Sequence, residues 1–198
     1  MMGEDAMRDH APRFHPRDAE DWWSWLAAHH DDPEPGVWLI EWRRASGRVP
    51  VDYEDLVAAA LAHGWIDGTR RTIDDERAEM WFTRRRPGSQ WTRLSKERAA
   101  RVEASGRMTD AGRAVIARAQ ADGTWSQLDA AEDGVVPDDL AAALAARPGA
   151  RQHFDGFRPG VRRSILAWIA QAKRPETRAG RIVETADKAA AGIAAHQQ

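Results

Sequence analysis

The spacing of apolar positions divides the chain into a region of mixed helices and strands and a region of helices alone. From Asp18 to His30, apolar side chains recur at i, i+3, i+4 and i+7, which predicts a helix with one buried face. Residues 37–44 alternate between apolar and polar, as a half-buried strand does. Asp52 can cap a helix that Gly64 ends in a left-handed conformation. Residues 65–73 and 79–85 then have the pattern of two strands joined by an acidic turn.

Beyond residue 90 the periodicity is helical. Thr109 is placed to cap a helix that ends at Gly123, and Asp138 begins a helix rich in alanine and leucine. Two more helices are predicted around Ile165 and after Pro175. These elements predict an α+β fold. The N-terminal half holds a small three-stranded, mainly antiparallel sheet with helices, and the C-terminal half is all helical.

The distribution of charge indicates where the two halves join. Residues 69–107 carry eleven basic and six acidic side chains, and residues 147–181 carry nine basic and two acidic ones. Between them, residues 129–140 hold five acids and no base, together with a glycine and a proline. We therefore expect a flexible leader over residues 1–16, an α+β domain over 17–128, an acidic linker over 129–138 and a helical domain over 139–198.

Composition narrows the class of protein. The 198 residues include no cysteine, which excludes zinc fingers, iron–sulfur clusters and cysteine catalysis. The formal net charge of −2 does not point to nucleic acid or to an anionic membrane. No apolar run approaches the ~20 residues of a membrane-spanning helix, and the N-terminus lacks the apolar segment of a secretion signal. We expect a cytoplasmic protein without membrane insertion. Ten tryptophans, against one tyrosine and four phenylalanines, indicate either a large aromatic core or an aromatic-lined pocket.

The first candidate for chemistry is Asp67, in the segment GWIDGTRR. On a regular strand Trp65, Asp67 and Arg71 share one side. An acid between an indole and a guanidinium can hold a ligand amine or orient a base. The alternative is that Asp67 pairs with Arg71, or with a base on the next strand, as an internal salt bridge.

The second candidate is the segment WFTRRRPGSQWTRLS, residues 81–95. Its arginines, Arg85 among them, match the geometry of carboxylates and phosphates. Ser89 and Trp91 follow a Pro-Gly turn, and an indole offers a stacking face for a base or a cation. The alternative is the solvated end of a hairpin with Trp91 in the core.

A third candidate is a stripe of arginines at the start of the last helix. Arg174, Arg178 and Arg181 fall at i, i+4 and i+7 and therefore share one helix face. Such a stripe can present a recognition helix to DNA. The alternative is a solvated face whose arginines pair with acids.

The common catalytic and cofactor motifs are missing. The chain has neither a Walker loop nor GxGxxG, and neither GxSxG nor HExxH. His29 and His30 are adjacent, so on a helix they point about 100° apart and cannot chelate one ion together. We expect no bound metal and no cofactor.

Several short segments, in a fixed order, resemble the YdeI/OmpD-associated family. In the N-terminal part they are Tyr53–Leu56, Leu61–Gly68, Phe82–Thr92 and Gly106–Gly112. In the C-terminal part, residues 136–140, 150–154 and 168–182 are similar to the bacteriocin-protection, OmdA-type segment. The chain departs from the family at Ala62-His63, Arg84, Thr92 and Ser95, where the family usually has Cys-Phe, Pro, Ser and often Asn. The resemblance implies a bacterial, cytoplasmic protein linked to outer-membrane proteins and to tolerance of bacteriocins or antimicrobial peptides. It supplies no catalytic residues and no cofactor.

Three functions follow as hypotheses. The first is a non-enzymatic binding module whose site is formed by Asp67, Arg85, Ser89 and Trp91, which match the family's pattern. Its partner would be an anionic small molecule or a protein. The second is a small-molecule enzyme with Asp67 as general base, which requires Asp67 in a pocket. The third is a nucleic-acid-binding regulator that uses the arginine stripe.

Overall fold

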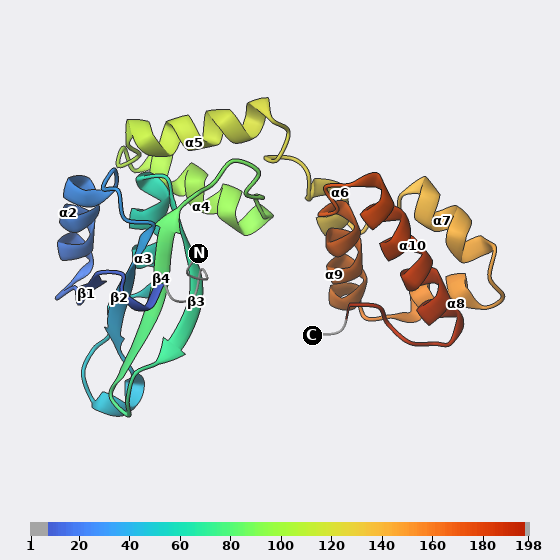
Figure 1. Ribbon diagram of the computed structural model, residues 1–198, viewed down its shortest axis with the longest axis horizontal. Helices are drawn as coiled ribbons and strands as arrows, with labels where there is room; N and C mark the ends of the chain where they lie inside the picture. Colours follow the sequence, from blue (N-terminus) through green and yellow to red (C-terminus); the bar gives the residue numbers. More distant parts are fainter. Residues whose placement is uncertain (1–7, 197–198) are drawn as a thin grey trace. The chain divides into compact units, whose positions relative to one another are not determined.

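The chain folds into two compact units. The computed structural model describes residues 8–196. Unit 1 comprises the residues up to Ser89 together with Leu94–Asp122, and unit 2 comprises Gln90–Arg93 and the residues from Gly123 onward (Figure 1). The α+β class predicted from the sequence is confirmed, and every strand among the described residues lies in unit 1.

Unit 1 is built from a sheet and helices close to those predicted. Its elements are β1 (Arg13–Phe14), α2 (Ala19–His29), β2 (Gly36–Trp42), the 3-10 turn η1 (Arg44–Ser46), α3 (Tyr53–Ala62), β3 (Trp65–Thr72), β4 (Arg77–Arg84), α4 (Arg93–Ala104) and α5 (Asp110–Ala121). Asp52 caps α3 by accepting a hydrogen bond from the backbone N–H of Glu54 at 2.7 Å. Gly64 follows α3 with φ +77°, the left-handed conformation that its sequence position predicts.

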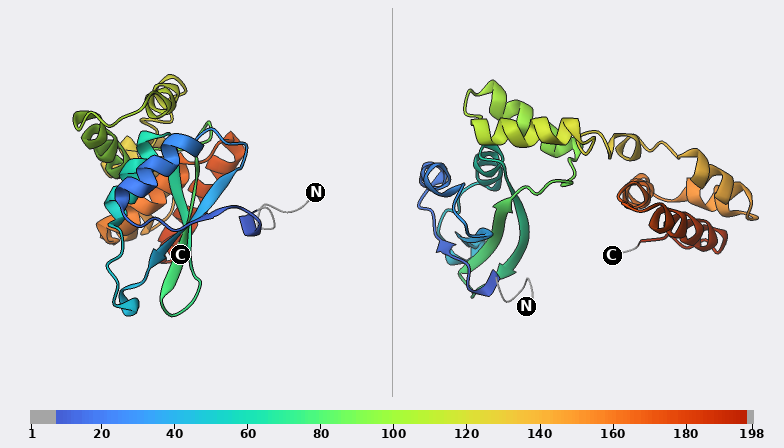
Figure 2. Two further views of the ribbon diagram at one scale, coloured as in Figure 1. Left: turned by 90° about the vertical axis from the view of Figure 1, so that its left-hand side faces the viewer. Right: turned by 45° about the horizontal axis from the view of Figure 1, so that its top comes forward.

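The sheet has four strands rather than the predicted three. Their order is β1-β2-β4-β3, with β2, β4 and β3 antiparallel and β1 parallel to β2. Strands β3 and β4 form a long hairpin (Figure 2). The additional strand, β1, lies in the segment predicted as a leader, of which residues 1–7 fall outside the described part. A strand of two residues has no alternation to detect, and its partner lies about two dozen residues away along the chain.

One face of the sheet packs against α2 and α3. Because residues opposite each other on neighbouring strands share a face, Leu39 and Met80 point to the same side, as do Val37 and Phe82. The indole N–H of Trp22 donates to the backbone oxygen of Leu56 at 3.1 Å, which ties α2 to α3 inside this core. The buried residues of this core are Trp22, Leu26, Val37, Leu39, Leu56, Ala59, Ala60, Trp65, Met80 and Phe82.

A β-bulge in β3 changes which side chains share a face. Asp67 pairs with Phe82 and Arg70 pairs with Met80, so β3 carries one extra residue between them. Arg71 therefore lies opposite Glu79, on the other face of the sheet from Asp67. The prediction that Trp65, Asp67 and Arg71 share one side is wrong for Arg71, because the inserted residue reverses the alternation.

The second face of the sheet carries a pair of buried tryptophans. Trp38 and Trp81 lie with their ring centroids 5.2 Å apart, and the guanidinium of Arg71 lies 4.0 Å from the centroid of Trp38. Glu79, 3% exposed, accepts hydrogen bonds from Arg71 Nε at 2.6 Å and from Arg13 Nε at 3.0 Å. Arg71 thus pairs with Glu79 and not with Asp67.

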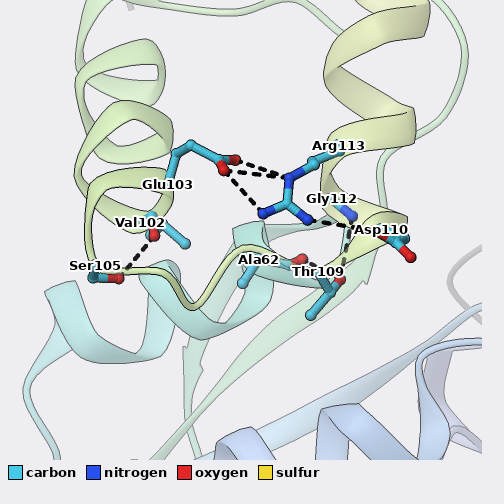
Figure 3. A network of polar contacts seen from close by, with 8 residues as sticks. All are labelled: Ala62, Val102, Glu103, Ser105, Thr109, Asp110, Gly112 and Arg113. Carbon is cyan, nitrogen blue, oxygen red and sulfur yellow. Dashed lines mark hydrogen bonds and ion pairs between the residues drawn. The ribbon is translucent and has the colours of Figure 1, made fainter.

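The turn between α4 and α5 is attached to the C-terminal end of α3. The Thr109 hydroxyl donates to the backbone oxygen of Ala62 and accepts from the backbone N–H of Gly112, so one side chain caps α5 and anchors it (Figure 3). Arg113 joins the two helices by pairing with Glu103 (Figure 3). Gly112 is required by this close approach, since a Cβ there would lie 2.4 Å from the Ala62 oxygen.

Unit 2 is helical, as predicted for the C-terminal half. Its helices are α6 (Asp129–Glu132), α7 (Asp138–Ala145), α8 (Ala150–Gly156), α9 (Pro159–Ala170) and α10 (Pro175–Ala190) (Figure 1). Helices α6 and α8 are too short to show a periodic pattern and were not predicted. Helix α6 lies in the segment interpreted as an acidic linker, and its Ala131 is buried in the core of unit 2. The largest buried side chains of that core are Leu140, Leu144, Phe154, Ile165 and Ile169.

The substitution Gly112→Ala tests the contact between α5 and α3. The added methyl group would meet the Ala62 oxygen and, at 2.6 Å, the Met108 sulfur, so we expect a loss of about 1–3 kcal/mol in the free energy of unfolding. The matched control is Gly180→Ala in α10, where a Cβ meets nothing within 4 Å and where alanine should stabilise by about 0.5–1 kcal/mol. Urea denaturation followed by circular dichroism measures both. Equal stability of Gly112→Ala and wild type would contradict the tight approach.

Candidate functional site

A cavity of about 510 Å³ lies in unit 1, walled by α2, α3, α4 and the turn after α4. We call it the arginine cavity. Its lining combines an indole, a small apolar floor and charged groups of both signs: Trp23, Glu54, Asp55, Ala58, Leu94, Arg98, Arg101, Val102, Ser105 and Arg107. A volume of this size is typical of small-molecule sites.

Glu54 is shared between two arginines at the centre of this cavity. Arg98, whose side chain is 10% exposed, binds both carboxylate oxygens of Glu54, with Nε donating to Oε2 at 2.9 Å. The Arg98 hydrogen bonds lower the pKa of Glu54 below its ordinary value. Arg101, whose side chain is 65% exposed, makes one contact with the same carboxylate, from Nη2 at 3.2 Å. One carboxylate is therefore shared by two guanidinium groups.

A polar layer behind Arg98 contains two of the residues singled out from the sequence. The guanidinium of Arg98 lies 5.5 Å from the ring centroid of Tyr53, and the Tyr53 hydroxyl donates to Asp67 Oδ2 at 2.8 Å. Burial and this hydrogen bond raise the pKa of Tyr53 to about 12. Burial lowers the pKa of Arg85 to about 10, and the charge of Asp67 opposes that shift. Asp67 and Arg85 thus interact in unit 1.

The mouth of the arginine cavity is closed on one side by a stacked pair. The guanidinium of Arg107 lies 3.8 Å from the ring centroid of Trp23. Its Nη1 and Nη2 donate to the two carboxylate oxygens of Glu20 at 2.8 and 2.9 Å. This double contact fixes the plane of the guanidinium and holds it against the indole. The cavity therefore has a flat wall made of an indole and a guanidinium whose charge is paired with Glu20.

The other two residues of the predicted site lie elsewhere. Ser89 is the last residue of its segment of unit 1, and its backbone N–H donates to the Arg86 oxygen at 3.1 Å. Trp91 belongs to unit 2, is 1% exposed and has its ring centroid 4.8 Å from that of Trp125. Its indole therefore packs inside the protein, as the alternative interpretation of the sequence proposed.

The arginine stripe of the last helix is largely engaged within unit 2. Arg178 donates from Nε and Nη2 to the two carboxylate oxygens of Asp139, at 2.8 and 3.0 Å. Arg181 donates to the backbone oxygen of Trp168 and lies 4.9 Å from the centroid of its ring. Arg174 is exposed and precedes α10. Two of the three side chains thus have partners inside the unit, which leaves Arg174 to face solvent.

Searches for two other kinds of site gave no candidate in the described part of the chain. Over residues 8–196, no three histidine, aspartate or glutamate side chains are grouped so that they could hold a metal ion. Over the same residues, none of the helices combines the length and the apolar character that crossing a membrane requires.

The sequence analysis missed Arg98 and Arg101, although a signal was present. Leu94, Arg98, Arg101 and Val102 occur at i, i+4, i+7 and i+8, which places them on one face of α4. A helix face that mixes arginines with apolar residues indicates a partly buried surface. The acidic partner, Glu54, lies about forty residues earlier and could not be assigned from spacing.

Comparison with protein families gives two matches. Residues 14–115, more than half of the chain, match the model of a domain of unknown function, DUF8412. The chain belongs to the DUF8412 family. The arginine cavity, from Trp23 to Arg107, lies entirely within this DUF8412 region.

The second match covers the part of the chain that follows the DUF8412 region. Residues 133–192 match the family described as bacteriocin-protection, YdeI or OmpD-associated, which confirms the resemblance seen in the C-terminal segments. No curated protein and no solved structure matches the chain significantly.

The DUF8412 region offers a pH-dependent test of the Glu54–Arg98 pair. We expect Glu54→Gln to destabilise the protein by about 1 kcal/mol at pH 7, because buried Arg98 loses its anionic partner. Since the folded state lowers the pKa of Glu54, its contribution is present above pH 4.5 and is lost as the pH falls through the lowered value. The difference between variant and wild type should therefore shrink below pH 4.5.

Thermal or urea unfolding between pH 3 and 7 provides this measurement. The control is Glu103→Gln, which removes an ion pair with Arg113 whose two side chains are each about half exposed, and should cost less than about 0.5 kcal/mol. A pH-independent effect of Glu54→Gln would contradict the assignment.

Proposed function

We propose that this protein is a binding protein of the bacterial cytoplasm, rather than an enzyme, and that it contributes to tolerance of bacteriocins or antimicrobial peptides. Two observations support the proposal. Residues 133–192 match a family whose description names bacteriocin protection. Unit 1 provides a small-molecule-sized cavity whose walls carry charged and aromatic groups.

The arginine cavity is the proposed ligand site, and the sharing of Glu54 is the observation that carries this assignment. Arg98 already binds both oxygens of Glu54, so the charge of Arg101 is only partly compensated. A guanidinium has five N–H donors, and the Glu54 contact uses one of those on Arg101. An exposed guanidinium with spare donors binds a carboxylate or a phosphate. The ligand class is therefore an anion.

The other lining residues of the cavity favour an anion that carries an apolar or aromatic group. Ala58 and Val102 form an apolar floor, and Trp23 with Arg107 forms a flat wall on which a ring can stack. The sequence hypothesis assigned these roles to Arg85 and Trp91. In the proposal Arg101 and Trp23 take them, and the charge of Asp67 lies near Arg98.

Survival assays test the biological part of the proposal. Expression of the protein in a bacteriocin-sensitive bacterium should raise survival, and the double variant Arg101→Ala, Arg107→Ala should abolish that gain. Arg113→Ala, which removes a comparably exposed arginine from α5 outside the cavity, should retain it. Full protection by the folded double variant would refute the arginine cavity as the site.

Calorimetry tests the ligand class separately. With 2-naphthoate as the probe, we expect Arg101→Ala, Arg107→Ala to weaken binding about tenfold or more, because two guanidinium groups leave the cavity. Asp55→Asn should strengthen binding about twofold, since it removes a like charge from the wall. Identical affinity in wild type and the double variant, or weaker binding by Asp55→Asn, would rule out an anion site here.

A further inference from the structure

A second cavity of unit 1, of about 600 Å³, has the opposite chemistry. We call it the tryptophan cavity, and it lies between the end of α2, the loop that leads into β2, the start of β3 and residues 10–12. The side chains that give it its character are His10, Trp25, His29, Asp32, Glu34 and Trp65. Nothing in the proposed function uses these residues.

The aromatic wall of this cavity is rigid. Trp25 and Trp65 meet edge to face, with their rings at 90° and their centroids 6.1 Å apart. The indole N–H of Trp65 donates to the backbone oxygen of His30 at 3.1 Å, and the ring of His29 stacks on Trp25 with centroids 4.6 Å apart. Trp22 stacks on Trp25 as well, with centroids 5.2 Å apart, so the wall is a packed aromatic surface that offers apolar contact to a ligand.

Two carboxylates stand at the rim without a counter-ion. Over residues 8–196, neither Asp32 nor Glu34 forms an ion pair with a lysine or an arginine. The backbone that carries them is nevertheless held, because Arg84 donates from Nη1 to the Asp32 oxygen at 2.6 Å and from Nη2 to the Glu34 oxygen at 3.0 Å. Arg84 thus holds the loop by binding two backbone oxygens of the loop. The side-chain carboxylates of Asp32 and Glu34 are not used in these contacts and can bind a ligand.

We infer that the tryptophan cavity binds an organic cation, an alkylammonium or guanidinium group on an apolar stem. The carboxylates of Asp32 and Glu34 supply the charge, the aromatic wall supplies an apolar surface for the stem, and the held loop lowers the entropic cost of binding. The same chemistry occurs in free amines and in the basic side chains of peptides. The site is independent of the arginine cavity, which takes an anion.

Calorimetry on the full chain with 2-naphthylmethylamine as the probe tests the inference. Asp32→Asn combined with Glu34→Gln should weaken binding about fivefold or more, while the affinity for 2-naphthoate should stay within about twofold. The matched control is Asp31→Asn, which removes the neighbouring carboxylate, 3.8 Å from His30 Nε2 and outside the set that defines the cavity. It should leave the amine affinity unchanged.

Two peptides show whether the bound cation is a free amine or a basic side chain of a peptide. Acetyl-Phe-Lys-Phe-amide and its acetyl-lysine counterpart differ in one charge. Binding of the lysine peptide, but not of the acetylated one, with the same dependence on Asp32 and Glu34, assigns the site to peptide side chains. Binding of the free amine alone assigns it to small amines. Failure of all cationic probes to bind, or binding unaffected by the double variant, overturns the inference and leaves the arginine cavity untouched.

Discussion

Burial of one face of α3 is the interaction on which unit 1 depends. Leu56, Ala59 and Ala60 press against the sheet, and Trp22 fixes α2 to α3 through the Leu56 carbonyl. At the C-terminal end of α3, the Ala62 oxygen contacts Thr109 and Gly112, which attaches α5 to this helix. Because α3 is fixed at both places, its first turn is fixed too, and that turn carries Tyr53 and Glu54 toward Asp67 and Arg98. The arginine cavity is thus a consequence of how the core packs.

The two cavities for which we propose ligands of opposite charge differ in how their charged side chains are paired. In the arginine cavity Glu54 is shared by Arg98 and Arg101, and Arg101 makes only one contact with it, so most of its N–H donors are left over. In the tryptophan cavity the guanidinium of Arg84 is bound to carbonyl oxygens, which leaves negative charge at the rim. In each cavity one arginine, Arg98 or Arg84, fixes neighbouring groups by hydrogen bonds. A different charged residue of the cavity is then left to contact a ligand. A guanidinium suits this role because its planar set of donors can bind two acceptors at once.

The sequence predicted the helices and strands that depend on neighbouring residues along the chain. Caps and periodicity located α2, α3 and α5, and alternation located β2, β3 and β4. It could not reveal β1, a two-residue strand paired with a distant partner, or the bulge after Asp67 that sends Arg71 to the other face. The ligand site formed by Asp67, Arg85, Ser89 and Trp91 stays a prediction. Asp67 and Arg85 interact in unit 1, whereas Trp91 packs in unit 2 against Trp125. The pairing of Glu54 with Arg98 joins two helices, and only tertiary structure reveals it.

We propose that an anionic ligand binds in the arginine cavity beside Trp23. The ten indole N–H groups give separate signals in a ¹H–¹⁵N correlation spectrum of the labelled protein, and each reports on its own surroundings. On titration with 2-naphthoate, the Trp23 signal should shift most, and the signals of Trp38 and Trp168, which lie outside the arginine cavity, should stay in place. A largest shift at Trp91, or no change at Trp23 when the probe is in excess, would contradict the account.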